Sequence, residues 1–163
     1  MGNLHIRRAR PADLGLLAEE ELGQRRFFAD RLDRQAKGLG MLLTAWSAGR
    51  SVGVVYLWLE EAEEAEIRRH LPCTPILNHL EIQRDHRGQG IGAQLISGAE
   101  RRLRMLGFRQ VALAVDERHG RLARWYQELG YAEWPHPTVR CLPFGDGEVE
   151  ICRVMVKSLL GEA

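Results

Sequence analysis

The distribution of apolar and polar residues divides the first part of the chain into strands and helices. Residues 4–8 alternate as an edge strand does, and a proline in the first turn predicts a helix over residues 11–21. A second helix is expected over residues 24–37. Two apolar runs follow, residues 41–46 and 52–59, and the polar segment between them predicts a hairpin. The sheet should therefore begin antiparallel.

The second half of the chain predicts a βαβ unit at the centre of the sheet. Residues 77–82 and 111–115 are apolar strands, and residues 90–106 form an amphipathic helix between them. The apolar stripe of this helix consists of Ile91, Leu95, Ala99, Leu103 and Leu106. Because such crossovers are right-handed, the two strands should be parallel. The other elements expected are helices over residues 60–70 and 121–129, and strands over residues 131–134 and 149–156.

Composition narrows the class of protein. The 163 residues suit one domain, residues 1–163, without repeats or linkers. The three cysteines, Cys73, Cys141 and Cys152, have neither C-x-x-C spacing nor a histidine at zinc-ligand spacing, so we expect no disulfide framework and no metal. No stretch approaches the roughly 20 apolar residues of a membrane helix, and no apolar leader region is present. We therefore expect a cytoplasmic protein without a membrane partner.

Charge is distributed unevenly, although the net charge is only +1. From Arg84 to Arg124, nine arginines outnumber four acidic residues, a surplus of five positive charges. Such a surplus attracts a polyanionic ligand. Nucleic acid is not the ligand we expect, because no aromatic residues are interleaved with these arginines as a base-stacking surface requires. A ligand with several phosphates, such as coenzyme A, suits the segment better.

Three alternate glycines, Gly88, Gly90 and Gly92, stand between the strand over residues 77–82 and the helix that follows it. Glycine tolerates positive φ and lets a ligand oxygen approach backbone N–H groups, and the first turn of a helix attracts anions. The spacing is neither that of a Walker loop nor that of a dinucleotide-binding fingerprint. From these residues alone, a phosphate-binding loop and a tight turn required by packing both remain open.

Two motifs give the chain a resemblance to a known family. Arg87-x-x-Gly90-x-Gly92, preceded by Leu80-Glu81-Ile82, matches the signature Q/R-x-x-G-x-G/A, and residues 123–131 match a helix that ends in a tyrosine followed by Leu-Gly-Phe/Tyr. In this order they resemble the GNAT superfamily of acyl-CoA N-acyltransferases. The resemblance implies an α/β (α+β) fold, with a mixed, mostly antiparallel sheet of six to seven strands, flanking helices and a central βαβ acyl-CoA-binding unit.

The resemblance also implies where acetyl-CoA binds. The backbone of residues 81–83 would pair with pantetheine and polarise the thioester carbonyl, and the glycine loop would hold the pyrophosphate. Arg87 either contacts that pyrophosphate or caps neighbouring carbonyls. His119 stands where the family commonly has an asparagine that contacts the coenzyme arm. The implied acetyl-CoA-binding residues are Ile82, Gln83, Arg84, Arg87, Gly88, Gln89, Gly90, Ile91, Gly92, Ala93, His119 and Tyr126.

Three residues are candidates for catalysis. The resemblance places the hydroxyl of Tyr126 near the coenzyme sulfur, where a phenol can protonate a thiolate, although a tyrosine on an apolar stripe also suits a core. Strand alternation puts Glu81 and His79 on one face and Asn78 on the other. Asn78 matches the position of the family's base but cannot accept a proton. Glu81 can serve as the base if a bulge re-aims it, and His79 is expected to be a structural hydrogen-bonding group.

The implied function is direct acetyl transfer from acetyl-CoA to a primary amine of a small molecule in a ternary complex. Two alternatives stay open, a protein acetyltransferase acting on an N-terminal or lysine amine, and a non-catalytic acyl-CoA-binding regulatory module. The acceptor should meet the first two helices and the loop over residues 135–148. Six aromatic residues have two interpretations, an aromatic wall that contacts the amine or ordinary core packing. They are Phe27, Phe28, Trp46, Tyr56, Trp58 and Trp134. The resemblance also allows a homodimer formed through terminal strands.

Overall fold

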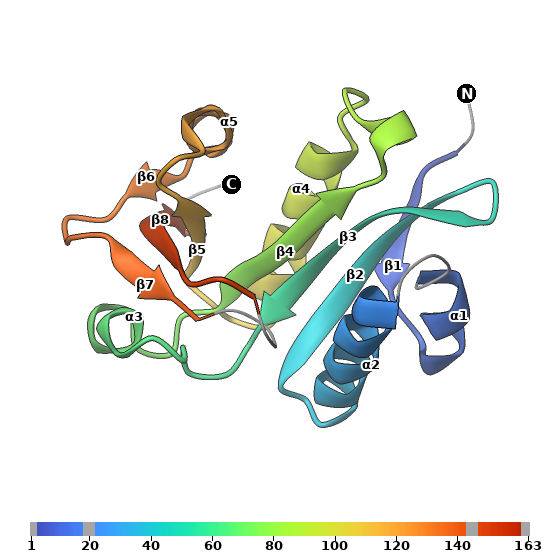
Figure 1. Cartoon of the computed structure of the whole chain (residues 1–163), viewed down its shortest axis with the longest axis horizontal. Coiled ribbons are helices and arrows are strands. Elements are labelled where there is room, and N and C mark those ends of the chain that lie inside the picture. Colours follow the sequence, from blue (N-terminus) through green and yellow to red (C-terminus); the bar gives the residue numbers. More distant parts are fainter. Residues whose placement is uncertain (1–2, 18–21, 143–146, 161–163) are drawn as a thin grey trace. The chain divides into compact units, whose positions relative to one another are not determined.

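The computed structural model of the chain describes residues 3–17, 22–142 and 147–160 (Figure 1). The chain folds into two compact units. The first comprises residues 1–59 and 78–102, and the second comprises residues 60–77 and 103–163. The chain passes from one unit to the other within strand β4 (Ile76–Ile82) and within helix α4 (Ile91–Met105), so these two elements contribute residues to both units.

The first unit is built on an antiparallel hairpin. Strand β2 (Gly40–Ser47) pairs with β3 (Arg50–Trp58), and β1 (His5–Arg8) pairs antiparallel with the other edge of β2. Ala48 and Gly49 form the turn with φ angles of 51° and 76°, the two positive values that a type I′ turn requires. The predicted hairpin is confirmed, with longer strands and a tighter turn than the sequence indicated. β4 is the next strand after β3 in the sheet.

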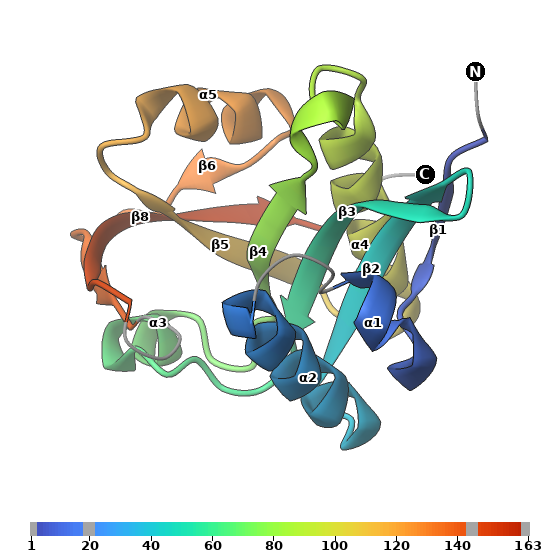
Figure 2. The same cartoon turned by 45° about the vertical axis from the view of Figure 1, so that its right-hand side comes forward.

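Two helices cover opposite faces of this part of the sheet. Helix α2 (Leu22–Ala36) lies on one face, and the beginning of α4 lies on the other (Figures 1 and 2). The helix predicted over residues 24–37 is therefore confirmed. The helix predicted over residues 11–21 is instead a 3-10 turn (Pro11–Asp13) continued by the single turn of α1 (Leu14–Leu17), and its predicted remainder, residues 18–21, lies outside the described residues.

The predicted apolar stripe of α4 is buried along the length of the helix. Leu95, Ala99 and Leu103 have no exposed surface, and Ile91 is 5% exposed. The prediction was wrong for Leu106, which is 55% exposed because it follows the end of the helix. In the first unit, the largest fully buried side chains on the two hairpin strands are Leu42, Leu43, Val52, Val55, Tyr56 and Leu57.

The second unit contains the parallel pair and the C-terminal strands. β4 begins parallel to β5 (Gln110–Asp116), with Ile76 opposite Ala112 and Leu77 opposite Leu113. β5 pairs antiparallel with β8 (Glu150–Ser158) over its whole length. Two short strands, β6 (Ala132–Glu133) and β7 (Val139–Cys141), also pair antiparallel with β8. The predicted parallel neighbours are thus confirmed.

Helices α3 (Ala65–His70) and α5 (Gly120–Glu128) complete the second unit. The core beside α3 is formed by Ala62, Ile67, Ala112, Trp134, Val139 and Val154. The residues that the structure describes form a sheet of eight strands, so the expected six to seven was too few. The additional strand is β7, whose three residues are too short to show a period of two in the sequence. The helix predicted over residues 60–70 is confined to α3, and the strand predicted over residues 131–134 is confined to β6.

The predicted fold class is confirmed, since the described strands form a mixed, mostly antiparallel sheet with one parallel pair and flanking helices. None of the described helices has both the length and the apolar character needed to cross a membrane.

Candidate functional site

The loop between β4 and α4 presents a row of backbone donors. Gly88 and Gly90 have φ angles of 77° and 80°, which favour glycine, and an added Cβ on either would meet no atom within 4 Å. The first hydrogen bond of the helix runs from Gln94 N–H to the Gly90 carbonyl at 3.1 Å. The N–H groups before it have no acceptor within the helix, and no acidic side chain lies in this turn. These donors belong to Ile91, Gly92 and Ala93.

This end of α4 can bind an anion. The helix has 15 residues, so its first turn carries the partial positive charge of aligned peptide dipoles. Arg84, Arg87 and Gln89 are exposed in the same loop. The Nε of Arg87 donates a hydrogen bond to the Ile82 carbonyl at 3.0 Å, which fastens the loop to the end of β4. Of the two roles open for Arg87, carbonyl capping is therefore present, and phosphate contact stays a prediction.

The middle of β4 is irregular. His79 has a φ of 55°, in the left-handed region that residues other than glycine rarely adopt. Three side chains around it contact α2: Asn78 Oδ1 accepts from Arg31 at 3.4 Å, the His79 ring packs on Phe27, and Glu81 Oε1 accepts from Gln24 at 3.4 Å. The expectation that Asn78 lies on the face opposite Glu81 was wrong, because the positive φ interrupts strand alternation.

His79 and Glu81 form a pair on this irregular strand. His79 Nε2 lies 2.9 Å from Glu81 Oε2, and the two side chains are 35% and 41% exposed. The His79 ring packs against Phe27, with centroids 4.1 Å apart, and meets Phe28 edge-on at 6.4 Å. Desolvation lowers the pKa of His79 below its usual value, the Glu81 carboxylate opposes this shift, and the positive charge of Arg31 adds to it.

Arg31 occupies the centre of an aromatic cluster on the α2 side of the first unit. Its residue is 5% exposed, and its guanidinium carbon lies 4.4 Å from the Phe27 ring centroid, 5.0 Å from Tyr56 and 5.6 Å from Trp58. Asp30 is its ion-pair partner. Arg34 lies over the Trp58 ring at 4.8 Å. Much of the expected aromatic wall therefore surrounds arginine side chains of the chain itself.

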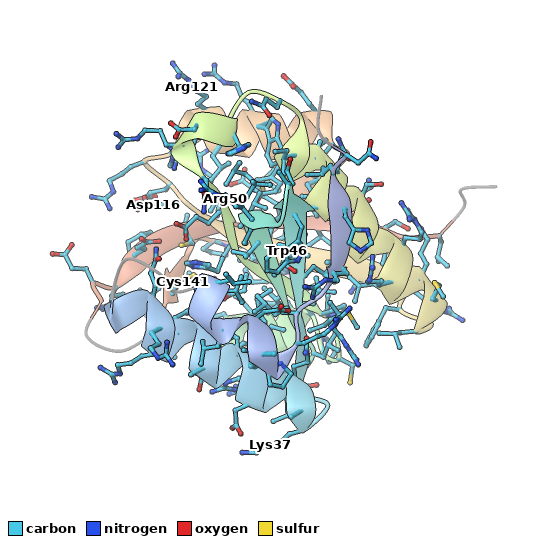
Figure 3. All side chains as sticks on the ribbon, turned by 90° about the vertical axis from the view of Figure 1, so that its right-hand side faces the viewer. Lys37, Trp46, Arg50, Asp116, Arg121 and Cys141 are labelled. Carbon is cyan, nitrogen blue, oxygen red and sulfur yellow. The ribbon has the colours of Figure 1, made fainter. Side chains whose placement is uncertain are left out.

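The other two tryptophans of that expected wall lie elsewhere. Trp46, labelled in Figure 3, packs under the guanidinium of Arg7 at 4.6 Å and donates to Thr44 Oγ1 at 2.6 Å. Trp134 belongs to the second unit, where it meets the rings of His70 and His136.

Tyr126 and His119 lie on the second unit. Tyr126 is buried on α5, and its ring packs edge-on against Trp125 and Tyr131. Desolvation raises the pKa of Tyr126 to about 12, so its hydroxyl keeps its proton at neutral pH. His119 directly precedes α5 and accepts the Ala123 N–H at its carbonyl oxygen, at 3.1 Å. Among the described residues, no group of three or more potential ligands is placed to hold a metal ion.

Sequence reasoning expected the acceptor to meet the second helix, but it missed two of the polar side chains that this helix contributes. Neither Gln24 nor Arg31 was singled out, although both reach β4. One signal was available, because Arg31 follows Phe27 by four residues and Phe28 by three, which places a charged residue within an apolar helical stripe. A buried charge in such a position usually has an ion-pair partner, here Asp30, whose side chain is partly exposed.

Comparisons with known proteins bear on the family and the fold. A sequence model described as the acetyltransferase (GNAT) family matches residues 7–131. Similar solved structures include the PaiA N-acetyltransferase of Thermoplasma acidophilum in complex with coenzyme A, with a TM-score of 0.70 and 16% identity over 96% of this chain and 99% of that one. A comparison with curated proteins gave no match.

Two further structures show the range of acceptors among similar folds. An Escherichia coli N-acetyltransferase of a ribosomal-protein alanine has a TM-score of 0.70 and 15% identity, over 99% of this chain and 97% of that one. A spermidine N-acetyltransferase chimera, derived in part from Vibrio cholerae, has a TM-score of 0.68 and 20% identity, over 96% and 95%. At these identities the likeness concerns the fold.

Proposed function

Because the chain belongs to the GNAT family of acetyltransferases, we propose that it transfers the acetyl group of acetyl-CoA directly to a primary amine of a small molecule in a ternary complex. The observation that carries the donor assignment is the row of N–H groups that follows Gly90 at the start of α4. A pyrophosphate carries the negative charge and the several acceptor oxygens that such a row can bind.

The end of β4 supports the positioning of the thioester. Gln83 N–H donates to the Val52 carbonyl of β3 at 2.9 Å. Because successive N–H groups of a strand point to opposite sides, the N–H of Ile82 points away from β3. We propose that this group pairs with pantetheine and polarises the thioester carbonyl, an effect worth about 3 kcal/mol where a single oxyanion donor has been removed in other enzymes.

We propose that the hydroxyl of Tyr126 donates a hydrogen bond to the departing sulfur. Its pKa of about 12 lies well above that of an ordinary thiol, about 8.5, so complete proton transfer from the phenol would be uphill by about 5 kcal/mol. Hydrogen-bond donation to the thiolate is the role that suits this pKa. The surplus proton of the attacking amine can then complete the thiol.

We propose that the acceptor is a small molecule and that it meets the α2 side of the first unit. The Phe27 ring and the Trp58 ring are already covered by Arg31 and Arg34, so this cluster does not offer an open aromatic box to a polycation.

We further propose that residues 1–163 act as one acetyltransferase domain, since the family match includes segments of both units.

The proposal is tested by acceptor-dependent release of thiol from acetyl-CoA. The purified chain is assayed with polyamines, aminoglycosides, amino acids and short peptides, and the acetylated product is identified by mass spectrometry. Because Cys73 is an exposed thiol, each assay needs a matched sample without acceptor. Binding of acetyl-CoA is measured separately by calorimetry.

The outcomes separate the candidate functions. Release that depends on a small amine supports the proposal, whereas release with peptides alone indicates a protein acetyltransferase. Tight binding without turnover on any acceptor would favour an acyl-CoA-binding regulatory module. Absence of acetyl-CoA binding would refute the donor site at the start of α4.

A further inference from the structure

We propose that His79 takes the proton from the acceptor ammonium and that Glu81 orients the His79 ring for this step. The inference rests on the proposed function, because it concerns the amine that receives the acetyl group. It also reverses the expectation that Glu81 is the base and that His79 has only a structural role. The supporting features are the hydrogen bond between the two side chains, the packing of α2 against them, and the charges nearby.

The hydrogen bond decides which nitrogen of His79 can accept a proton. Nε2 lies 2.9 Å from Glu81 Oε2, and an ionised carboxylate can only accept hydrogen bonds. Nε2 must therefore carry the hydrogen, which leaves the lone pair of the neutral imidazole on Nδ1. Nδ1 makes no hydrogen bond with any residue that the structure describes. The neutral ring thus presents a proton acceptor.

Helix α2 holds both members of the pair. Phe27 packs against the His79 ring, with centroids 4.1 Å apart. Gln24 Nε2 donates to Glu81 Oε1 at 3.4 Å, while Oε2 accepts from His79. Each oxygen of the Glu81 carboxylate therefore already accepts a hydrogen bond, whereas Nδ1 of the ring does not. This asymmetry favours His79 as the base and Glu81 as its positioning partner.

The backbone of His79 is maintained against its intrinsic preference. A positive φ at a residue other than glycine costs roughly 1–3 kcal/mol, and such strain is concentrated at functional sites. The strain turns Asn78, His79 and Glu81 together toward α2. A glycine would adopt this φ without strain, but it would supply no imidazole.

Desolvation keeps the ring neutral, although the adjacent Glu81 carboxylate opposes it. Glu81 lies on the same strand, and Arg31 approaches from α2 with Asp30 as its ion-pair partner. Desolvation and Arg31 lower the pKa of His79, and Glu81 raises it. Because the outcome is a lowered pKa, the imidazole is unprotonated at pH 7 and can accept a proton.

The reaction balances with His79 in this role. The acceptor arrives as an ammonium ion, and Nδ1 removes one proton to leave a neutral amine and an imidazolium. The amine lone pair forms the C–N bond at the thioester carbonyl carbon, and the C–S bond then breaks with its electron pair on sulfur. The second amine proton completes the thiol, and the imidazolium releases its proton to solvent. The products are an acetamide, a thiol and one proton per turnover.

Two variants of the pair separate the roles, using the acceptor identified by thiol release. His79→Asn retains a residue that tolerates positive φ but cannot act as a base. It should lower kcat/KM by about 100- to 10,000-fold, the usual effect of removing a general base. Glu81→Gln keeps an acceptor oxygen for Nε2–H and should lose less, about 10- to 100-fold, the loss found for partners that orient metal-bound histidines. His5→Asn replaces an exposed histidine of β1, serves as the control and should leave kcat/KM unchanged.

The pH profile adds a readout that a structural role would not change. The acid limb of kcat/KM should shift to lower pH in Glu81→Gln, because the carboxylate that raises the pKa of His79 is gone. An unshifted limb, or a His79→Asn variant with the rate of the parent protein, would overturn the proposal. A larger loss in Glu81→Gln than in His79→Asn would also overturn it and assign the base to Glu81.

A second measurement needs no acceptor and therefore remains informative if the proposed function fails. Long-range proton–nitrogen NMR of the labelled protein reports the tautomer of each histidine, and the His79 signals are identified by their absence from His79→Asn. We expect a protonated Nε2 and an unprotonated Nδ1 at pH 7. A predominant Nδ1–H tautomer would contradict the proposal whatever the acceptor.

Discussion

The ring of Tyr56 occupies the space into which any side chain at Gly40 would project. A Cβ on Gly40 would lie 1.8 Å from Tyr56 Oη and 2.3 Å from Cζ. Tyr56 has no exposed surface, so its ring cannot move aside without disturbing its neighbours. The same ring faces the guanidinium of Arg31 at 5.0 Å, so Gly40 contributes indirectly to the position of α2.

Gly40→Ala should destabilise the protein by about 1–3 kcal/mol, because overpacking forces buried side chains from their preferred positions. For a chain of this size, the melting temperature should fall by roughly 2–4 °C per kcal/mol, measured by calorimetry. Gly15→Ala is the matched control, since a Cβ there meets no atom within 4 Å and the residue lies in helix α1. Equal melting temperatures for the two variants would contradict the assigned contact.

Asp13→Asn should lower the free energy of unfolding at pH 7 by about 1.5–3 kcal/mol, the range for hydrogen bonds to charged groups. Asp13 accepts two hydrogen bonds from Arg7, at 2.7 and 3.0 Å, and one from Arg10 N–H at 2.7 Å. The Arg7 hydrogen bonds, as the largest influence, lower the pKa of Asp13 in the folded protein. Denaturant unfolding measures the difference.

The lowered pKa of Asp13 determines how the destabilisation caused by Asp13→Asn depends on pH. A lowered folded pKa means that the carboxylate stabilises the fold above its unfolded pKa of about 3.9 and loses that contribution as pH falls through the folded pKa. The difference between the parent protein and Asp13→Asn should therefore shrink progressively as the pH falls below the unfolded pKa of about 3.9. Asp33→Asn, which removes the exposed pair with Lys37, should cost less than about 0.5 kcal/mol at any pH.

Gly90→Ala should weaken acetyl-CoA binding by about 5- to 30-fold. An alanine at the observed φ of 80° is strained by roughly 1–2 kcal/mol, and relief of this strain would turn the N–H row away from its ligand. Gly107→Ala imposes similar strain at φ 92° in the turn after α4 and should leave affinity unchanged. Calorimetric titration with acetyl-CoA measures the affinity of both variants. Equal losses of affinity in Gly90→Ala and Gly107→Ala would argue against a phosphate site at Gly90.

Tyr126→Phe should lower kcat by about 10- to 100-fold, the equivalent of one hydrogen bond of about 1.5–3 kcal/mol to a charged sulfur. Acetyl-CoA affinity should stay within about twofold, because hydrogen-bond donation matters when the thiolate forms and little before. Tyr131→Phe removes a hydroxyl from the adjacent ring and serves as the control. Unchanged kcat in Tyr126→Phe would remove this hydroxyl from the mechanism.

Local features of the fold could be predicted because their information lies within a few residues. The hairpin follows from two apolar runs around Ala48-Gly49, and the βαβ unit from two apolar strands around an amphipathic helix. The donor loop follows from Gly88 and Gly90, since few residues other than glycine adopt the observed φ. Strand β7 escaped prediction because three residues do not establish a period.

The arrangement of the candidate base could not be predicted in the same way. The period-two alternation of side chains along a strand correctly predicted that His79 and Glu81 share a face, but it placed Asn78 on the opposite face. Nothing in the sequence near His79 indicates its positive φ, which is found in the folded chain where α2 packs against β4.

The sequence by itself determined the order of elements, the glycine loop and its resemblance to one enzyme family, because these depend on local backbone preferences and hydrophobic periodicity. Tertiary structure alone decided which side chains meet. Arg31 and Asn78 are 47 residues apart in the chain, and Gln24 and Glu81 are 57 apart. Contacts at such separations form only when burial of the whole apolar core offsets the entropy of closing the intervening chain, so no short segment encodes them.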